Sequence, residues 1–227
     1  MANKKTAGRM KVMYAFLLLF GPAFLLVFIA TRGCEHKFKE LDDFGKANKY
    51  SFVDARGKKF SYKDFDGDIV LITTLQETCP DSCAISFWHM NQAIYQHIRK
   101  NKKRMKQVKI ISFATDGHGK PLKDLSVIRQ SLEDNVLEYD PDIWYLASGD
   151  VQQLYNFERN NNSLLQEGDE FFGGQGFQEL VLLLDKKNDL RMVLSGTSEG
   201  MIRRMKEHVA LLQKQYDKER AAKTKSK

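Results

Sequence analysis

The chain has 227 residues, 42% of them hydrophobic, and a formal net charge of +7 at pH 7. This positive charge is concentrated at the two ends, because residues 1–11 and 214–227 each carry a net +4 and residues 12–213 carry −1. A nucleic-acid-binding domain carries its basic residues on the fold itself, so nucleic acid is excluded as the expected partner. The three cysteines, Cys34, Cys79 and Cys83, are too few for a fold built on disulfides.

The N-terminal segment has the pattern of a membrane anchor. Residues 1–11 are basic, and Val12 to Ala30 contain no charged residue over 19 positions. A helix of that length crosses the hydrocarbon core of a bilayer, and it exceeds the apolar core of most cleaved signal peptides. The positive-inside rule places residues 1–11 in the cytoplasm and the chain after about residue 32 outside. We therefore expect a single-pass protein of a bacterial inner membrane, anchored by residues 12–30, with a soluble domain in the periplasm.

Residues 31–48 are charged and are expected to form a linker between the anchor and one folded domain, residues 49–216. Cys34 directly follows Gly33, and the sequence leaves open whether it is lipidated. Residues 217–227 form a basic tail that is expected to be disordered.

Within the domain, apolar periodicity predicts strands that alternate with helices. Residues 50–62 predict a hairpin, and the run from Ile69 to Leu75 predicts a buried strand that is followed by a helix to about Arg99. The remaining elements are expected as a strand over 108–114, a helix over 121–132, a strand over 143–147, a short helix over 151–157, a loop over 159–176, strands over 177–184 and 190–194, and a helix over 198–216. Such an order, ending on an antiparallel hairpin and a helix, predicts an α/β, thioredoxin-like fold with an N-terminal β-hairpin.

The segment Thr78-Cys79-Pro80-Asp81-Ser82-Cys83 lies where the first buried strand leads into the first long helix. If Cys79 caps that helix, the two sulfurs share one helix face, because residues four apart are neighbours there. The free N–H groups and the positive dipole end of a helix favour a thiolate. A thiol of lowered pKa is a nucleophile or a ligand for a soft metal. The motif therefore indicates disulfide exchange or Cu(I) binding.

With these residues, the chain resembles the Sco/SenC family of membrane-anchored, thioredoxin-like proteins over roughly residues 45–215. The motif from Cys79 to Cys83 is a close form of the family's Cys-Pro-Asp-x-Cys, and the segment Trp144 to Gly149 and the strand entering a hairpin at Val181–Asp185 add to the likeness. The resemblance implies a protein on the outer face of the inner membrane. It also implies a role in copper delivery to the dinuclear copper site of cytochrome c oxidase, or in reduction of the cysteines of that site.

The resemblance further implies a copper ion held by the two cysteines and by a distant histidine, and here this sequence departs from the family. That histidine is expected near Phe177 or Gln178, but residues 119–207 contain no histidine. Two thiolates alone can bind Cu(I), whereas Cu(II) prefers additional nitrogen or oxygen ligands. His118, in the loop after the second core strand, is the one plausible substitute ligand.

Three functional hypotheses remain open. The first is thiol–disulfide exchange by Cys79 and Cys83 in oxidase assembly, which needs no histidine. The second is Cu(I) carriage by the same two thiolates, and the third is a non-catalytic assembly factor. The expected partner is the copper-site subunit of cytochrome c oxidase or another periplasmic thiol protein.

Overall fold

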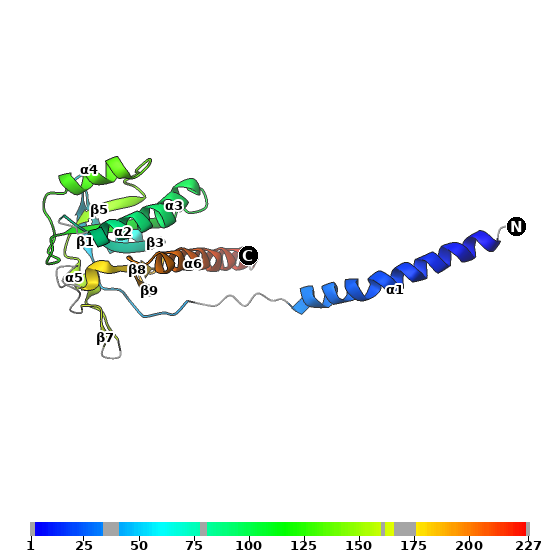
Figure 1. Ribbon diagram of the computed structural model, residues 1–227. Coiled ribbons are helices and arrows are strands. Elements are labelled where there is room, and N and C mark those ends of the chain that lie inside the picture. Colours follow the sequence, from blue (N-terminus) through cyan, green and yellow to red (C-terminus); the bar gives the residue numbers. More distant parts are fainter. Residues whose placement is uncertain (1–2, 34–40, 78–80, 160–161, 166–175, 226–227) are drawn as a thin grey trace. The chain divides into compact units, whose positions relative to one another are not determined.

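The structure is a computed structural model that describes residues 3–33, 41–77, 81–159, 162–165 and 176–225 (Figure 1). The chain divides into two compact units, Met1–Lys39 and Glu40–Lys227. We describe each unit by itself.

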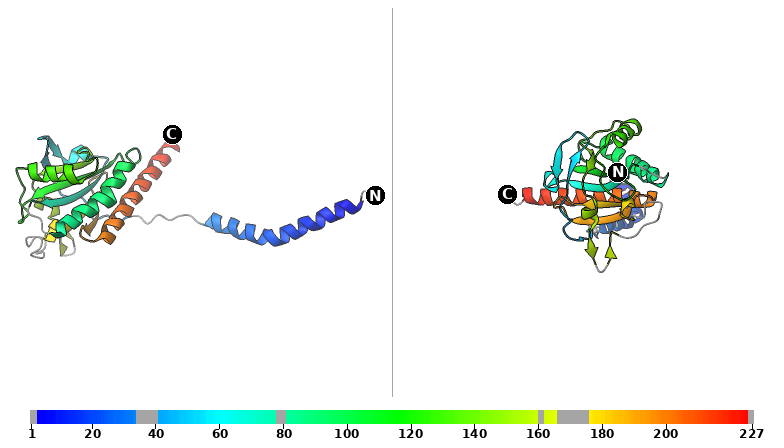
Figure 2. Two further views of the ribbon diagram at one scale, coloured as in Figure 1. Left: turned by 45° about the horizontal axis from the view of Figure 1, so that its top comes forward. Right: turned by 90° about the vertical axis from the view of Figure 1, so that its left-hand side faces the viewer.

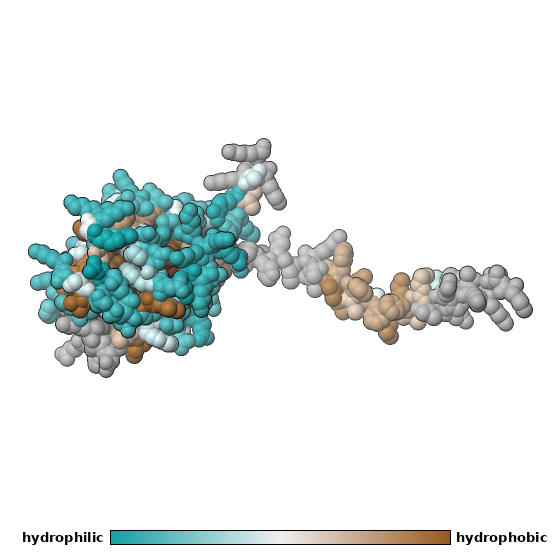
Figure 3. Space-filling view, turned by 90° about the horizontal axis from the view of Figure 1, so that it is seen from above, coloured by the Kyte–Doolittle hydropathy of each residue, from teal (hydrophilic) through white to brown (hydrophobic). Residues whose placement is uncertain are grey.

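The first unit contains one helix, α1, over Asn3–Gly33, with Pro22 inside it. Its middle part exposes large apolar side chains on all sides, among them Phe16, Leu18 and Phe24 (Figure 3). Among the described residues, no helix has the length and apolar character that crossing a membrane requires. The anchor over residues 12–30 therefore stays a prediction.

The second unit is built on a seven-stranded sheet. Its strands are β1 (Ser51–Asp54), β2 (Lys59–Ser61), β3 (Ile69–Gln76), β4 (Val108–Thr115), β5 (Trp144–Ser148), β8 (Leu180–Leu184) and β9 (Leu190–Ser195), in the order β2-β1-β5-β4-β3-β8-β9. The three central strands β3, β4 and β5 are parallel, whereas β8 runs antiparallel to β3 and pairs with β9 as a hairpin. This confirms the predicted α/β arrangement with its N-terminal hairpin β1–β2.

Side chains of the central strands alternate between two cores, as the two-residue period of a strand requires. Along β3, Leu71 lies in the core on one face and Ile72 in the core on the other. The helices on the first face are α2 (Asp81–His89), η2 (Met90–Tyr95), α3 (Gln96–Lys100), α4 (Ser126–Asn135) and α6 (Glu199–Lys225). Figure 2 shows α6 beside the α2–α3 segment, and it packs against η2. The second face is covered by α5 (Gln152–Tyr155), η1 (Tyr62–Phe65) and aromatic side chains of the hairpin.

The predicted helix after Cys83 is present, but η2 interrupts it with a π-helical turn that the apolar spacing did not predict. The predicted helix over 121–132 begins later, at Ser126. Two contacts explain the delay. The Leu122 N–H donates to the Ala114 carbonyl and keeps the chain extended beside β4, and the Asp124 carboxylate accepts from the Ser126 N–H at 2.9 Å, where the helix starts.

The predicted linker over 31–48 is wrong for its second half, because residues 41–48 belong to the folded unit. Leu41 and Ala47 are buried, and the Phe44 N–H donates to the Leu190 carbonyl. Arg191 fixes the start of this segment by donating to the carbonyls of Leu41 and Asp42. All buried apolar side chains of the described residues lie between Leu41 and Tyr216, so residues 40–227 contain a complete core.

The prediction of a disordered tail from residue 217 is also wrong, because α6 continues to Lys225. Glu219 on this extension pairs with Lys186 of the β8–β9 turn, and the Lys186 ammonium lies 3.9 Å from the centre of the Tyr216 ring. The burial of Tyr216 under these groups raises its pKa to about 12. These contacts hold the end of the helix on the fold.

The predicted loop over 159–176 contains part of a two-stranded sheet formed by β6 (Glu158–Arg159) and β7 (Asn162–Ser163). The strand predicted from Phe177 begins only at Leu180, because Gly176–Glu179 forms a 3-10 turn, η4. Side-chain contacts of Phe177 and Gln178 account for this difference and bear directly on the site.

Candidate functional site

The candidate site lies at the carboxyl ends of β3 and β4, where α2 begins. The strand β3 ends at Gln76, and α2 starts at Asp81. Cys79 lies outside the described residues. Cys83 lies in the first turn of α2, as predicted, but its side chain is not among those described. The proximity of the two sulfurs therefore stays a prediction.

Gln178 lies near the position of the missing histidine, and the structure gives it a defined role. Its side chain is buried, and its Oε1 accepts a hydrogen bond of 2.7 Å from Thr115 at the end of β4. Its Nε2 donates to the Gly117 carbonyl at 3.2 Å, and its own carbonyl accepts from the Thr74 hydroxyl at 2.7 Å. Gln178 thus joins η4 to β3 through its backbone carbonyl, and to β4 and the loop 116–119 through its side-chain amide.

Phe177, the other position considered for the histidine, is fully buried in the second core. Its ring centre lies 5.2 Å from that of Tyr155, and a side chain at Gly119 would collide with the Phe177 ring. Of the two positions, only Gln178 is oriented toward the ends of β3 and β4. The apolar run that begins at Phe177 is typical of a strand, so the sequence did not predict the 3-10 turn at its start.

Gln178 and residues Ser86 and Phe87 of α2 line one small cavity. The cavity has a volume of about 10 Å³ and lies among Thr73, Thr74, Leu75, Ser86, Phe87, Met90, Trp144, Gln178 and Glu179. That volume accommodates about one water molecule. The cavity is therefore too small for an organic substrate.

The C-terminal half of α2 is fixed by the segment that follows β9. Gly196 donates from its N–H to the Glu179 carbonyl at 2.7 Å, and its carbonyl lies 3.4 Å from Nδ1 of buried His89. A Cβ atom at Gly196 would collide with the Ser86 hydroxyl. The contact between His89 and the Gly196 carbonyl therefore joins the C-terminal end of α2 to this segment.

His118, the proposed substitute ligand, is exposed in the loop 116–119. The Asp116 carboxylate accepts a hydrogen bond of 2.8 Å from the backbone N–H of His118. The carbonyl of Gly117, the residue before His118, accepts a hydrogen bond from Nε2 of Gln178. This loop thus lies at the same end of the sheet as the start of α2. Within the described residues, no group of three or more His, Cys, Asp or Glu side chains could hold a metal ion. The role of His118 as a ligand beside the two cysteines stays a prediction.

Two exposed apolar side chains on α2 were not singled out from the sequence. Ile85 and Trp88 are 48% and 54% exposed. They are three residues apart and so share one face of α2, in the two turns that follow Cys83. A large exposed aromatic side chain on this helix is a suitable contact for a protein partner.

Comparisons with known proteins bear on this arrangement. Residues 39–214 match the family model described as SCO1/SenC. Among solved structures, BsSco, a member of the Sco family of cytochrome c oxidase assembly proteins with an identified disulfide switch, is 17% identical with a TM-score of 0.53, covering 79% of this chain and 99% of its own. Copper-bound ScoI from Bradyrhizobium japonicum is 14% identical with a TM-score of 0.50, covering 74% of this chain and 99% of its own. A search of curated proteins finds no match.

Proposed function

Because the chain belongs to the SCO1/SenC family, we propose that it acts in assembly of the copper site of cytochrome c oxidase as a thiol–disulfide oxidoreductase. The observation that carries this proposal is the spacing of Cys79 and Cys83 between the end of β3 and the first turn of α2. The disulfide switch of BsSco, a protein with the same fold, supports it.

In the proposed reaction, the Cys79 thiolate attacks a disulfide of the client protein and forms a mixed disulfide, which releases one client thiolate. The Cys83 thiolate then attacks the sulfur of Cys79 and releases the second client thiolate. The client disulfide gains two electrons, and this protein is oxidised to the Cys79–Cys83 disulfide. The two client thiolates take up the protons that Cys79 and Cys83 gave up. The N–H groups of the first turn of α2 favour the thiolate form.

The second candidate function is Cu(I) carriage to the same client, with copper as cargo. The copper-bound structure of ScoI favours it by the common fold. Two thiolates suit Cu(I), which is soft and accepts few ligands. The amide of Gln178 is a poor third ligand, because its Oε1 already accepts from Thr115 and oxygen binds Cu(I) weakly. His118 is the proposed third ligand if one takes part.

Membrane attachment is part of the proposal. Residues 12–30 are uncharged, and the described part of α1 exposes apolar side chains around its whole circumference. We propose that this segment anchors the chain in a bacterial inner membrane and that residues 40–227 work in the periplasm. The client is the copper-site subunit of the oxidase or another thiol protein of that compartment.

An anaerobic Cu(I) titration separates the two chemistries. Reduced residues 40–227 compete with a chromophoric chelator, and the Cys79→Ser variant serves as the control. Exchange as the main role predicts Cu(I) binding no tighter than in this control. Tight one-to-one binding of Cu(I) that is lost in the control would instead identify copper carriage as the main role. A strain with Cys83→Ser that assembles the oxidase normally would contradict both and leave a non-catalytic assembly factor.

A further inference from the structure

A basic groove lies at the end of the sheet opposite to the cysteines. It has a volume of about 450 Å³ and lies between the loop 101–107 and the C-terminal half of α6. The charged side chains that line it are Lys103, Arg104, Lys214, Asp217 and Arg220. Gln213 of α6 donates to the Arg104 carbonyl at 3.4 Å and joins the two walls.

Most of the positive charge in this groove is uncompensated. Arg220 pairs with Asp217, the one acid in the lining. Lys103, Arg104 and Lys214 are exposed, and within the described part of the chain none of them pairs with a carboxylate. Burial, and then the charge of Lys206, lowers the pKa of His97, which also lines the groove.

The chain enters the folded unit at this same end. Ile69, the first residue of β3, donates from its N–H to the Gln107 carbonyl of the loop 101–107. Val70 pairs with Leu184, so the β8–β9 turn also lies at the amino end of β3. The guanidinium of Arg191, just after that turn, donates a hydrogen bond of 2.7 Å to the Leu41 carbonyl. The groove, the β8–β9 turn and Leu41 thus share one end, whereas α2 begins at the other.

Seven residues, 34–40, connect α1 to Leu41. A chain of that length spans at most about 30 Å even when fully extended. If α1 is anchored in the bilayer, as the proposed function has it, this short connection limits how far Leu41 can move from the lipid headgroups. Anionic headgroups attract exposed lysine and arginine side chains, each contributing to binding near the surface.

We propose that Lys103, Arg104 and Lys214 bind the phosphate groups of anionic phospholipids in the membrane that holds the anchor. This contact turns the end that carries Cys83 and Trp88 away from the bilayer and toward the client. The proposal rests on the membrane attachment in the proposed function, and it adds the lipid class and the orientation of the domain. Exposed, widely accessible cations suit a lipid surface better than a single small anion, which is usually held by buried donors.

The test measures binding of residues 40–227 to sedimented vesicles, without the anchor. Vesicles of phosphatidylcholine alone are compared with vesicles that contain phosphatidylglycerol, at low and high salt. We expect binding to the phosphatidylglycerol vesicles only, and a loss of that binding at high salt. The variant Lys103→Glu/Lys214→Glu should bind at least about tenfold more weakly.

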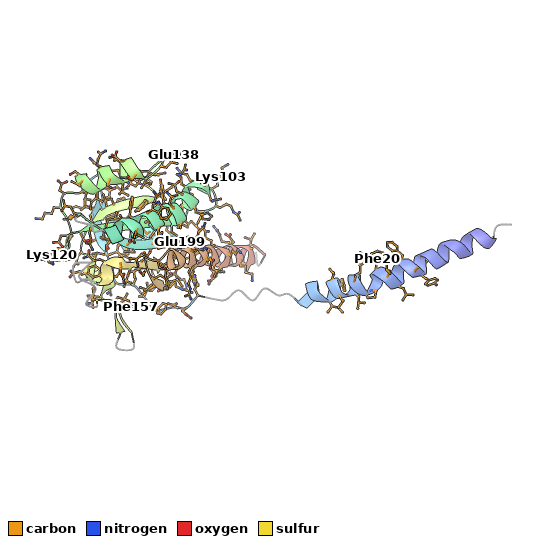
Figure 4. The ribbon with its side chains drawn as sticks, in the orientation of Figure 1. Phe20, Lys103, Lys120, Glu138, Phe157 and Glu199 are labelled. Carbon is orange, nitrogen blue, oxygen red and sulfur yellow. The ribbon has the colours of Figure 1, made fainter. Side chains whose placement is uncertain are left out.

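The matched control is Lys120→Glu/Lys123→Glu, which makes the same change in charge at the other end of the sheet. Figure 4 shows Lys103 and Lys120 at opposite ends of the domain. Equal losses in both double variants, or equal binding to both vesicle types, would overturn the proposal. Displacement by inorganic phosphate, but not by chloride at equal ionic strength, would overturn it in favour of a small-anion site. Because this assay uses neither cysteine, its failure leaves the exchange reaction standing, and failure of that reaction leaves this result intact.

Discussion

Thr115 Oγ1 donates a hydrogen bond of 2.7 Å to Gln178 Oε1 and thereby fixes Gln178 against the end of β4, at one of the two positions where the family resemblance leads us to expect a histidine. The same amide reaches the Gly117 carbonyl, so its two polar atoms are both engaged. Gln178, one of the two positions at which a metal-ligand histidine is expected, therefore serves to connect η4 with the sheet. This arrangement is why exchange, which needs only the two thiols, fits the chain better than copper carriage.

Removing this connection should destabilise the fold. Gln178→Ala leaves the buried hydroxyl of Thr115 and the carbonyl of Gly117 without this partner, and an unsatisfied buried polar group costs about 1–3 kcal/mol. Urea unfolding of residues 40–227 measures the loss. Adding Thr115→Val to Gln178→Ala should cost less than the sum of the two single changes. Strict additivity would show that the hydrogen bond contributes nothing.

Restoring the histidine should change the metal preference. Gln178→His places an imidazole at the end of the sheet where α2 begins, and Cu(II) favours nitrogen ligands beside thiolates. We expect Cu(II) affinity to rise by about tenfold or more, which is at least 1.4 kcal/mol. Gln153→His on the exposed surface of α5 is the control. No gain at Gln178 over this control would mean that the position does not face the cysteines.

Gly196 should not tolerate a side chain. Gly196→Ala forces its Cβ against the Ser86 hydroxyl and to 3.2 Å from the Glu179 carbonyl, so the Ser86 side chain or the backbone around it must shift. We expect a loss of about 1–3 kcal/mol in the free energy of unfolding. Gly200→Ala, near the start of α6, would place its Cβ at an ordinary contact distance of 3.8 Å from the Ser198 hydroxyl, and it should instead stabilise the helix by up to about 1 kcal/mol. Similar effects of both changes would contradict the close packing of α2 on Gly196.

Trp88 should matter for the client but not for small thiol reagents. Trp88→Ala removes an exposed aromatic contact on α2, and such contacts carry much of the energy of an interface. We expect the second-order rate of client reduction to fall by about tenfold, while reaction with an aromatic disulfide reagent stays unchanged. Val127→Ala, which truncates an exposed side chain on α4, is the control. An equal fall in the rates of reaction with the client and with the reagent would mean that Trp88 maintains the structure of the site instead.

The sequence predicted the elements whose signal is local. The mostly apolar runs at 69–75 and 108–114 are typical of strands buried on both faces, and both strands are present. Phe177 and Gln178 were misassigned to a strand because their conformation depends on Thr74 and Thr115, which are about 60 to 100 positions away. The helical extension after Tyr216 likewise depends on Lys186, a contact that composition alone does not indicate.

The site itself was predictable only in part. The motif from Cys79 to Cys83 and its place before a helix could be recognised from residue types and spacing. The exposure of Trp88 could not, since apolar residues at helical spacing usually face a core. The role of Gln178 needed the fold, because a polar residue beside an apolar run carries no sign of its partners.

Trapping of the mixed disulfide tests the central claim most directly. Reduced residues 40–227 are mixed with a client fragment whose two copper-site cysteines form a disulfide, and the products are separated by mass. The account predicts that Cys83→Ser accumulates a covalent adduct through Cys79, that Cys79→Ser accumulates far less, and that the unmodified domain releases reduced client. A Cys83→Ser variant that forms no adduct, while the unmodified domain leaves the client oxidised, would contradict it.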